Sequence, residues 1–171
     1  MWGHRSQRAA LACALLSVVL GGGQAQAQTG TATAKAITLR PLSIVKLRDL
    51  DFGTLIAGPA AGTVTIDPED GSRSTTGGVG AAGGAPQAAQ FYTYGGPRQY
   101  IQVTRGPFPT LARVGGGATM TVDELTLNGA TFRYLNTSGV LDLRVGGRLR
   151  VGANQLAGDY AGNFTITVTY Y

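Results

Sequence analysis

The stretch GDYAGNFTITVTYY, residues 158–171, indicates the fold class of this 171-residue chain. Within it, Phe164, Ile166, Val168 and Tyr170 alternate with three threonines. Successive side chains of a β-strand point to opposite faces, so this alternation predicts a strand with one apolar face. Similar short runs recur upstream between Gly, Pro, Asn and Asp residues, and no helical periodicity accompanies them. We therefore predict an all-β chain folded as an immunoglobulin-like β-sandwich.

Further strands and one hairpin are predicted from local patterns. The sequence predicts a first strand over residues 36–39. Asn128-Gly129 separates apolar runs at 118–127 and 131–135, and this dipeptide favours a two-residue turn because both residues tolerate positive φ. We therefore expect these two runs to pair as a hairpin.

Glycine-rich stretches predict two more connections. Gly146-Gly147 lies between runs at 139–145 and 147–152 and indicates a tight turn. Asp70-Gly71 indicates a polar turn after a strand. The segment at 71–86, GSRSTTGGVGAAGGAP, has almost no apolar bulk and predicts a mobile loop or a segment lying on a neighbouring surface.

The N-terminal residues have the pattern of a secretory signal peptide. Arg5 and Arg8 precede the uncharged apolar stretch 9–20, and Ala25 and Ala27 fit the small-residue cleavage rule. The stretch is too short to span a membrane permanently. We expect cleavage after Ala27, hence export to the periplasm and then to the cell surface or the medium, with no transmembrane anchor in the mature chain.

The mature chain is predicted to hold an N-terminal extension over 28–36 and one β-sandwich domain over 37–171. The sole histidine, His4, and the sole cysteine, Cys13, leave with the signal peptide. We treat Cys13 as a passive residue of the apolar stretch, because its neighbours fit a lipid-attachment site poorly. No thiol nucleophile, imidazole base or nitrogen or sulfur zinc ligand then remains. We expect no metal, no cofactor and no catalytic residues.

Loss of Arg5 and Arg8 leaves 12 Lys+Arg against nine Asp+Glu, a formal charge of +3. Nucleic-acid binding proteins show clustered Lys and Arg, and here the charges are spread along the chain. We expect no nucleic-acid partner.

Three clustered carboxylates could suggest a calcium-binding loop. Asp67, Glu69 and Asp70 do not have EF-hand spacing, and Asp with Gly is typical of ordinary turns. A turn is the favoured interpretation.

Two carboxylate pairs are candidates for glycoside hydrolysis. Asp123 and Glu124 are neighbours in a predicted strand, so we expect them on opposite faces. Asp49 and Asp51 share a face but precede FGTL, which indicates strand packing. A hydrolase acting through carboxylates alone stays as the third alternative.

Aromatic residues concentrate at Tyr92, Tyr94 and Tyr100, with Phe91 beside them. They predict either a stacking platform for sugars or, for about half of them, places in the core.

The C-terminal stretch also carries a family resemblance. The ending G-x-Y-x-x-x-F-x-I-x-V-x-Y, from Gly158 through Tyr160 to Tyr170, resembles the C-terminal signature of pilus subunits of the bacterial chaperone–usher route, especially the archaic branch. Residues 32–55, 62–67 and 143–170 resemble a proteobacterial secreted-domain family of unknown function.

The resemblance to pilus subunits implies a sandwich that lacks its final strand. A periplasmic chaperone, and later the N-terminal extension of a neighbouring subunit, fills the resulting groove by β-strand addition. It implies a non-catalytic structural subunit, fimbrial or adhesive, that forms a homopolymer. The implied contact residues are Gly158, Tyr160, Phe164, Ile166, Val168 and Tyr170.

The donated strand is expected from the segment that follows Ala27. Its candidate residues are Ala34, Ala36, Ile37 and Leu39. An alanine-rich donor buries little apolar area. The alternative is therefore a self-contained secreted module that binds carbohydrate or a cell-envelope partner through Tyr92, Tyr94 and Tyr100.

Overall fold

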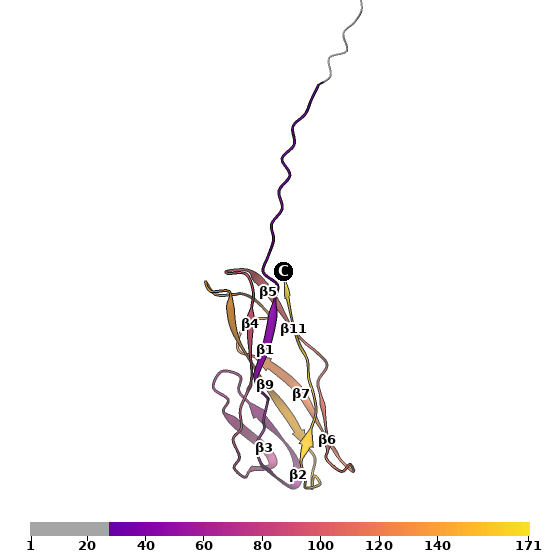
Figure 1. Ribbon diagram of the computed structural model, residues 1–171. Helices are drawn as coiled ribbons and strands as arrows, with labels where there is room; N and C mark the ends of the chain where they lie inside the picture. Colours follow the sequence, from indigo (N-terminus) through magenta and orange to yellow (C-terminus); the bar gives the residue numbers. More distant parts are fainter. Residues whose placement is uncertain (1–27) are drawn as a thin grey trace, which may run out of the picture. The chain divides into compact units, whose positions relative to one another are not determined.

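The computed structural model describes residues 28–171, and the predicted signal peptide at 1–27 lies outside the described residues. Residues 37–171 form one compact unit. Residues 28–36 have no secondary structure and are solvent-exposed. Strands alone make up the regular structure of the described residues (Figure 1). The all-β prediction is confirmed.

Eleven strands follow one another along the chain and are joined by short turns and loops. Their bounds are β1 Ser43–Arg48, β2 Leu55–Ile66, β3 Arg73–Ala81, β4 Ala89–Tyr94, β5 Tyr100–Arg105, β6 Thr110–Arg113, β7 Thr119–Leu127, β8 Phe132–Tyr134, β9 Val140–Val151, β10 Tyr160–Ala161 and β11 Ile166–Tyr170.

The strands build two antiparallel sheets that pack as a β-sandwich, as predicted. The larger sheet has the order β1-β4-β9-β7-β6-β10, with β2 paired to both β3 and β9. The smaller sheet has the order β11-β5-β8. Side chains of both sheets meet in the core, where Ile101 and Val103 of β5 pack with Leu143 of β9. All three side chains are buried because alternate residues of each strand face the opposite sheet.

The core continues in a second cluster, toward the other end of the larger sheet. This cluster is centred on Val64, Ile66, Leu125 and Leu149. Ile166 of β11 packs against both clusters, as does Phe91 of β4. The C-terminal strand therefore touches the core along its length.

Two predictions about the strands are wrong. Residues 36–39 form no strand, and the first strand begins at Ser43. Asn128-Gly129 does not close a hairpin, because β7 pairs with β6 and β9 while β8 pairs with β5 in the other sheet. The Asn128 side chain instead holds β9, where its Oδ1 accepts a hydrogen bond from Arg144 N at 2.8 Å.

The glycine-rich stretches also differ from prediction in two of three cases. Most of segment 71–86 is strand β3, paired with β2 and buried at Val79. Gly146-Gly147 lies inside the continuous strand β9. The Asp70-Gly71 turn is confirmed: Gly71 has a φ of 74° and its N–H donates to Asp67 O at 3.0 Å.

Packing explains the two glycines of β9. A Cβ on Gly146 would collide with Ile66 O and lie 2.8 Å from Pro68 N. A Cβ on Gly147 would lie 2.8 Å from Glu124 O. These backbone neighbours cannot yield as a flexible side chain could, so glycine lets β2 and β7 flank β9 closely.

We expect Gly146→Ala to lower the free energy of unfolding by about 1–3 kcal/mol, since the added methyl group forces the backbones apart. Urea unfolding followed by circular dichroism measures this. Gly80→Ala in β3 is the control, because its nearest neighbour would be Ile56 Cβ at 3.8 Å. Equal stability of both variants would contradict the packing argument.

A candidate strand-binding groove

The first strand, β1, is an edge strand of the larger sheet. Among the described strands it pairs only with β4. All six of its residues are exposed, although three are large and apolar. Ile44, Val45 and Leu47 have exposed fractions of 39, 47 and 48%. An edge strand with exposed apolar side chains is a template for another strand.

The C-terminal strand, β11, is an edge of the smaller sheet. Within residues 28–171 it pairs only with β5, from Ile166 opposite Arg105 to Tyr170 opposite Ile101. Its inward side chains, those of Ile166, Val168 and Tyr170, remain only partly buried against the core. One edge of β11 thus carries backbone N–H and C=O groups that no described strand pairs.

The two open edges approach each other where β1 begins and β11 ends (Figure 1). Tyr170 joins them, because its Oη donates to Arg40 O at 2.6 Å and accepts from Gly96 N at 2.7 Å. Leu42 packs in the same cluster as Val168 and Tyr170. The sandwich is therefore closed at this end by a side chain.

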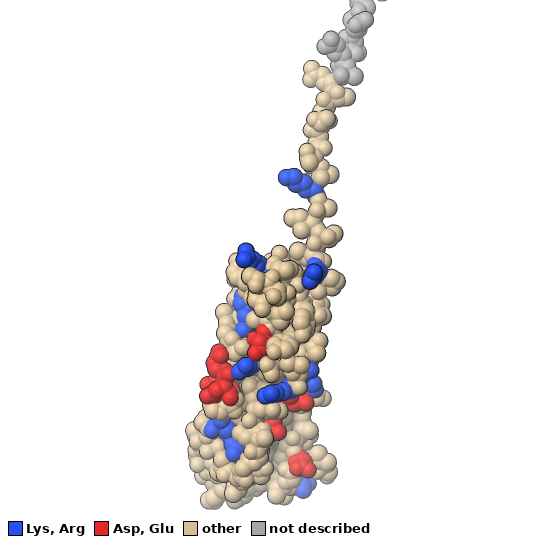
Figure 2. Space-filling model, turned by 60° about the vertical axis from the view of Figure 1, so that its left-hand side comes forward, with Lys and Arg blue, Asp and Glu red and all other residues tan. Residues whose placement is uncertain are grey.

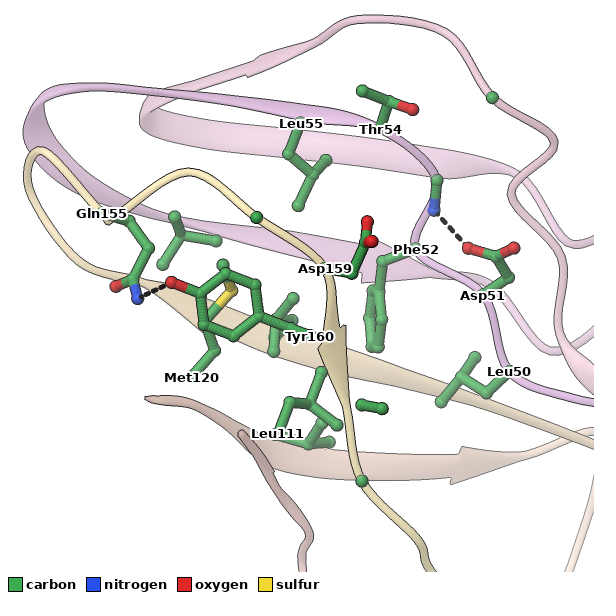
Figure 3. Close-up of a pocket in the computed structure, with 18 of the residues that line it drawn as sticks. Leu50, Asp51, Phe52, Thr54, Leu55, Leu111, Met120, Gln155, Asp159 and Tyr160 are labelled. Carbon is green, nitrogen blue, oxygen red and sulfur yellow. Dashed lines mark hydrogen bonds between the residues drawn. The ribbon is translucent and has the colours of Figure 1, made fainter. Parts of the chain in front are cut away.

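The residues that follow β1 and those that precede β11 line a cleft of about 1110 Å³. Residues 49–57 line one part of it, and residues 158–162 with Phe164 line another. Figure 3 shows side chains from different elements pointing into this space, among them Phe52, Met120 and Tyr160. The floor includes the buried side chains of Val122 and Leu149. We call β1, this cleft and the free edge of β11 the groove.

The six predicted contact residues all belong to the C-terminal part of this groove. Gly158, Tyr160 and Phe164 line the cleft, and Ile166, Val168 and Tyr170 continue along β11. The backbone conformation and the surroundings of Gly158 also require glycine at this position. Its φ is 146°, and a Cβ would collide with the Arg113 side chain, whose Nε donates to Ala157 O at 2.7 Å.

The part of the groove that precedes residue 60 was not singled out from the sequence. Leu50, Phe52 and Leu55 line the cleft, yet LSIVKL and LDFGTL have the pattern of ordinary sandwich strands. Only the pairing shows that β1 has a free edge. Alternation reveals which side chains share a face and says nothing about which strand occupies an edge.

The four predicted donor residues are all solvent-exposed. Ala34, Ala36, Ile37 and Leu39 lie in a segment without secondary structure, and Ile37 is 89% exposed. In the described chain these residues form no strand pairing that would have to break before they paired with another domain.

The predicted aromatic platform is divided between the two sheets. Tyr92 and Tyr94 lie on β4 with ring centroids 6.2 Å apart. Tyr100 lies on β5, and its nearest aromatic neighbour is Tyr134 at 4.6 Å. The structure therefore does not assemble these three tyrosines into one surface.

The carboxylates that were candidate site residues have local partners. Asp67 Oδ1 and Asp70 Oδ1 accept hydrogen bonds from Glu69 N and Ser72 N, which is a turn arrangement. Asp49 pairs with Lys46 at 2.7 Å, and Asp51 accepts from Gly53 N at 2.7 Å. Within residues 28–171, no group of three acidic, histidine or cysteine side chains could hold a metal ion.

The expectation that Asp123 and Glu124 face opposite ways is wrong. A register shift between Val122 and Glu124 lets both carboxylates reach Arg148, at 2.9 and 3.1 Å. Asp123 also binds Arg150. Desolvation raises the pKa of Asp123, but the two arginines outweigh it, so the net pKa is below the usual range. Figure 2 shows basic and acidic side chains interleaved on the face it presents.

The comparisons with known proteins identify a family. The sequence profile of a domain of unknown function, DUF4402, matches residues 42–170. The chain belongs to the DUF4402 family. No curated protein and no solved structure matches this DUF4402 chain significantly. None of the residues described for it forms a helix long and apolar enough to cross a membrane.

We expect Tyr170→Phe to lower the free energy of unfolding of this DUF4402 domain by about 1–3 kcal/mol. The variant leaves the N–H of buried Gly96 without its acceptor. Thermal unfolding by calorimetry measures the loss. Tyr171→Phe is the matched control, because Tyr171 is 78% exposed, and it should change nothing measurable. If the two variants unfold alike, Tyr170 does not anchor the segment before β1.

We expect Asp123→Asn to lower the free energy of unfolding at pH 7 by about 1 kcal/mol, a value discounted for the exposure of both arginines. Because the folded pKa of Asp123 is depressed, this stability is present above the unfolded pKa and disappears as pH falls through the folded one. Urea titrations at pH 7 and below about pH 3 test this. Asp49→Asn, at a 76% exposed carboxylate, serves as control. A difference that persists in acid would contradict the assignment.

Proposed function

We propose that this DUF4402 chain is an exported, non-catalytic structural subunit whose sandwich is completed by a strand from another chain. The observation that carries the proposal is the pair of free edges, on β1 and β11, together with a cleft lined by the residues that follow β1 and those that precede β11. A strand laid between them would pair with unsatisfied backbone groups and cover Phe164 and Ile166.

The exposure of the β1 side chains supports the proposal that a partner strand covers this edge. Lys46 and Arg48 place charge on this strand, as natural edge strands do to avoid aggregation. Ile44, however, pairs with the buried Thr93 and so shares its inward face, while remaining 39% exposed. An inward apolar side chain that is not covered indicates a missing neighbour.

The proposed donor is the N-terminal segment of a second copy, with Ala34, Ala36, Ile37 and Leu39 as candidate contacts. Ile37 and Leu39 alternate, so one face of the donated strand carries both and can turn them into the cleft. Such head-to-tail contacts do not close on themselves, and a filament results. Before assembly, a periplasmic chaperone would supply the strand.

We test the proposal by appending a second copy of residues 28–41 after Tyr171 through a short turn, so that it runs antiparallel to β11. The mature chain alone is expected to aggregate, to form filaments visible by negative-stain microscopy, or to co-purify with a chaperone. The appended chain is expected to be monomeric and more stable by about 3 kcal/mol, from burial of one Ile and one Leu. Light scattering and urea unfolding are the measurements.

The matched control carries Ile37→Asp and Leu39→Asp in the appended copy only. It should behave as the unmodified chain, because the donor keeps its length but loses its apolar contacts. The proposal would be contradicted if the mature chain is a monodisperse monomer, refolds unaided and gains no stability from the appended segment.

A further inference from the structure

Four aromatic rings gather on the outer face of the smaller sheet. Tyr100 of β5 lies 4.6 Å from Tyr134 and 6.1 Å from Phe132, both on β8, between ring centroids. The ring of Tyr171, which follows β11, lies 4.9 Å from Phe132 and 5.8 Å from Tyr100. The smaller sheet thus brings together Tyr100 and Tyr171, which lie 71 positions apart in the sequence.

These rings are open to solvent. The exposed fractions of Phe132, Tyr134 and Tyr171 are 38, 66 and 78%. Scattered exposed aromatics are normal, but a contiguous cluster marks an interaction site. The Tyr100 and Phe132 rings are nearly parallel, with an interplanar angle of 23°, and the Tyr134 ring is tilted by 42° to Tyr100. The Tyr171 ring stands nearly edge-on to Phe132, at 73°.

The rest of this face is polar without charge. Strand alternation and the register place Gln102, Thr104, Thr167 and Thr169 on the same side as the rings. The charged residues of these strands face the other way: Arg133 Nη1 donates to Asn128 O at 3.1 Å, and Arg105 binds Leu125 O. We call these eight outward residues the aromatic face.

We propose that the aromatic face binds a neutral polysaccharide. A pyranose ring has a flat side of C–H groups that stacks on aromatic rings, and hydroxyl groups at its rim that bond to amides and hydroxyls such as those of Gln102 and Thr169. The absence of a charged side chain among the eight residues disfavours an anionic polymer.

The aromatic face is distinct from the groove. A donated strand would use the free edge of β11 and the inward side of its residues, whereas the rings lie on the opposite side of the same sheet. None of the eight residues lines the cleft. The inference therefore does not rest on the proposed function, and the two can fail separately.

The test is binding of the exported chain, in whatever assembled state it is isolated, to a fixed panel of neutral hexasaccharides. The panel is cello-, xylo-, manno-, malto- and chitohexaose, measured by isothermal titration calorimetry, with a sulfated oligosaccharide as the anionic comparison. We expect at least one neutral member to bind and the anionic one not to bind. Tyrosine fluorescence should change on binding.

Tyr134→Ala and Phe132→Ala are expected to weaken binding about tenfold each, through loss of one stacking ring. Tyr94→Ala is the matched control: this tyrosine is 41% exposed on the other sheet, and its loss should leave the affinity unchanged. Tyr134→Phe should keep most of the affinity because the ring remains. Unchanged far-ultraviolet circular dichroism shows that a variant is folded.

Three results would overturn the proposal. They are a panel without a neutral binder, binding that Tyr134→Ala leaves intact, and equal loss in Tyr94→Ala. If Tyr134→Ala instead changes filament formation while no glycan binds, the aromatic face is a contact between proteins.

Discussion

The structure depends on backbone hydrogen bonding that is incomplete along one seam. The larger sheet is continuous from β1 to β10, and β3, β8 and β10 are, like β1 and β11, each paired with one described strand. At β1 and β11 the two sheets meet without pairing. An unpaired edge can accept another strand, and at β1 exposed apolar side chains accompany the free edge.

Close packing around β9 contrasts with the open edges of β1 and β11. β9 lies in the middle of the larger sheet, flanked by β2, β4 and β7, and its two adjacent glycines permit the close approach of β2 and β7. Buried Leu143 belongs to one core cluster and buried Leu149 to the other, so β9 contributes to both. The single hydroxyl of Tyr170 fastens the start of the domain to its end.

Prediction from sequence worked where alternation carried the information. The all-β class, the Asp70-Gly71 turn and the inward face of Ile166, Val168 and Tyr170 follow from a period of two and from turn chemistry. Prediction from sequence was wrong where glycines are adjacent in the chain. Gly146-Gly147 and the segment near Val79 have the local pattern of turns and loops. They lie in strands, where glycine lets the neighbouring backbones approach closely.

The sequence by itself determined the class of the protein, the apolar face of its C-terminal strand and the lack of His and Cys in the chain after residue 27. Only the tertiary structure decided that β1 and β11 have free edges, and that Tyr100 joins Phe132, Tyr134 and Tyr171 rather than Tyr92 and Tyr94. The reason is physical. Side-chain alternation is local, whereas strand order and cross-strand neighbours arise from pairing between segments far apart in the chain.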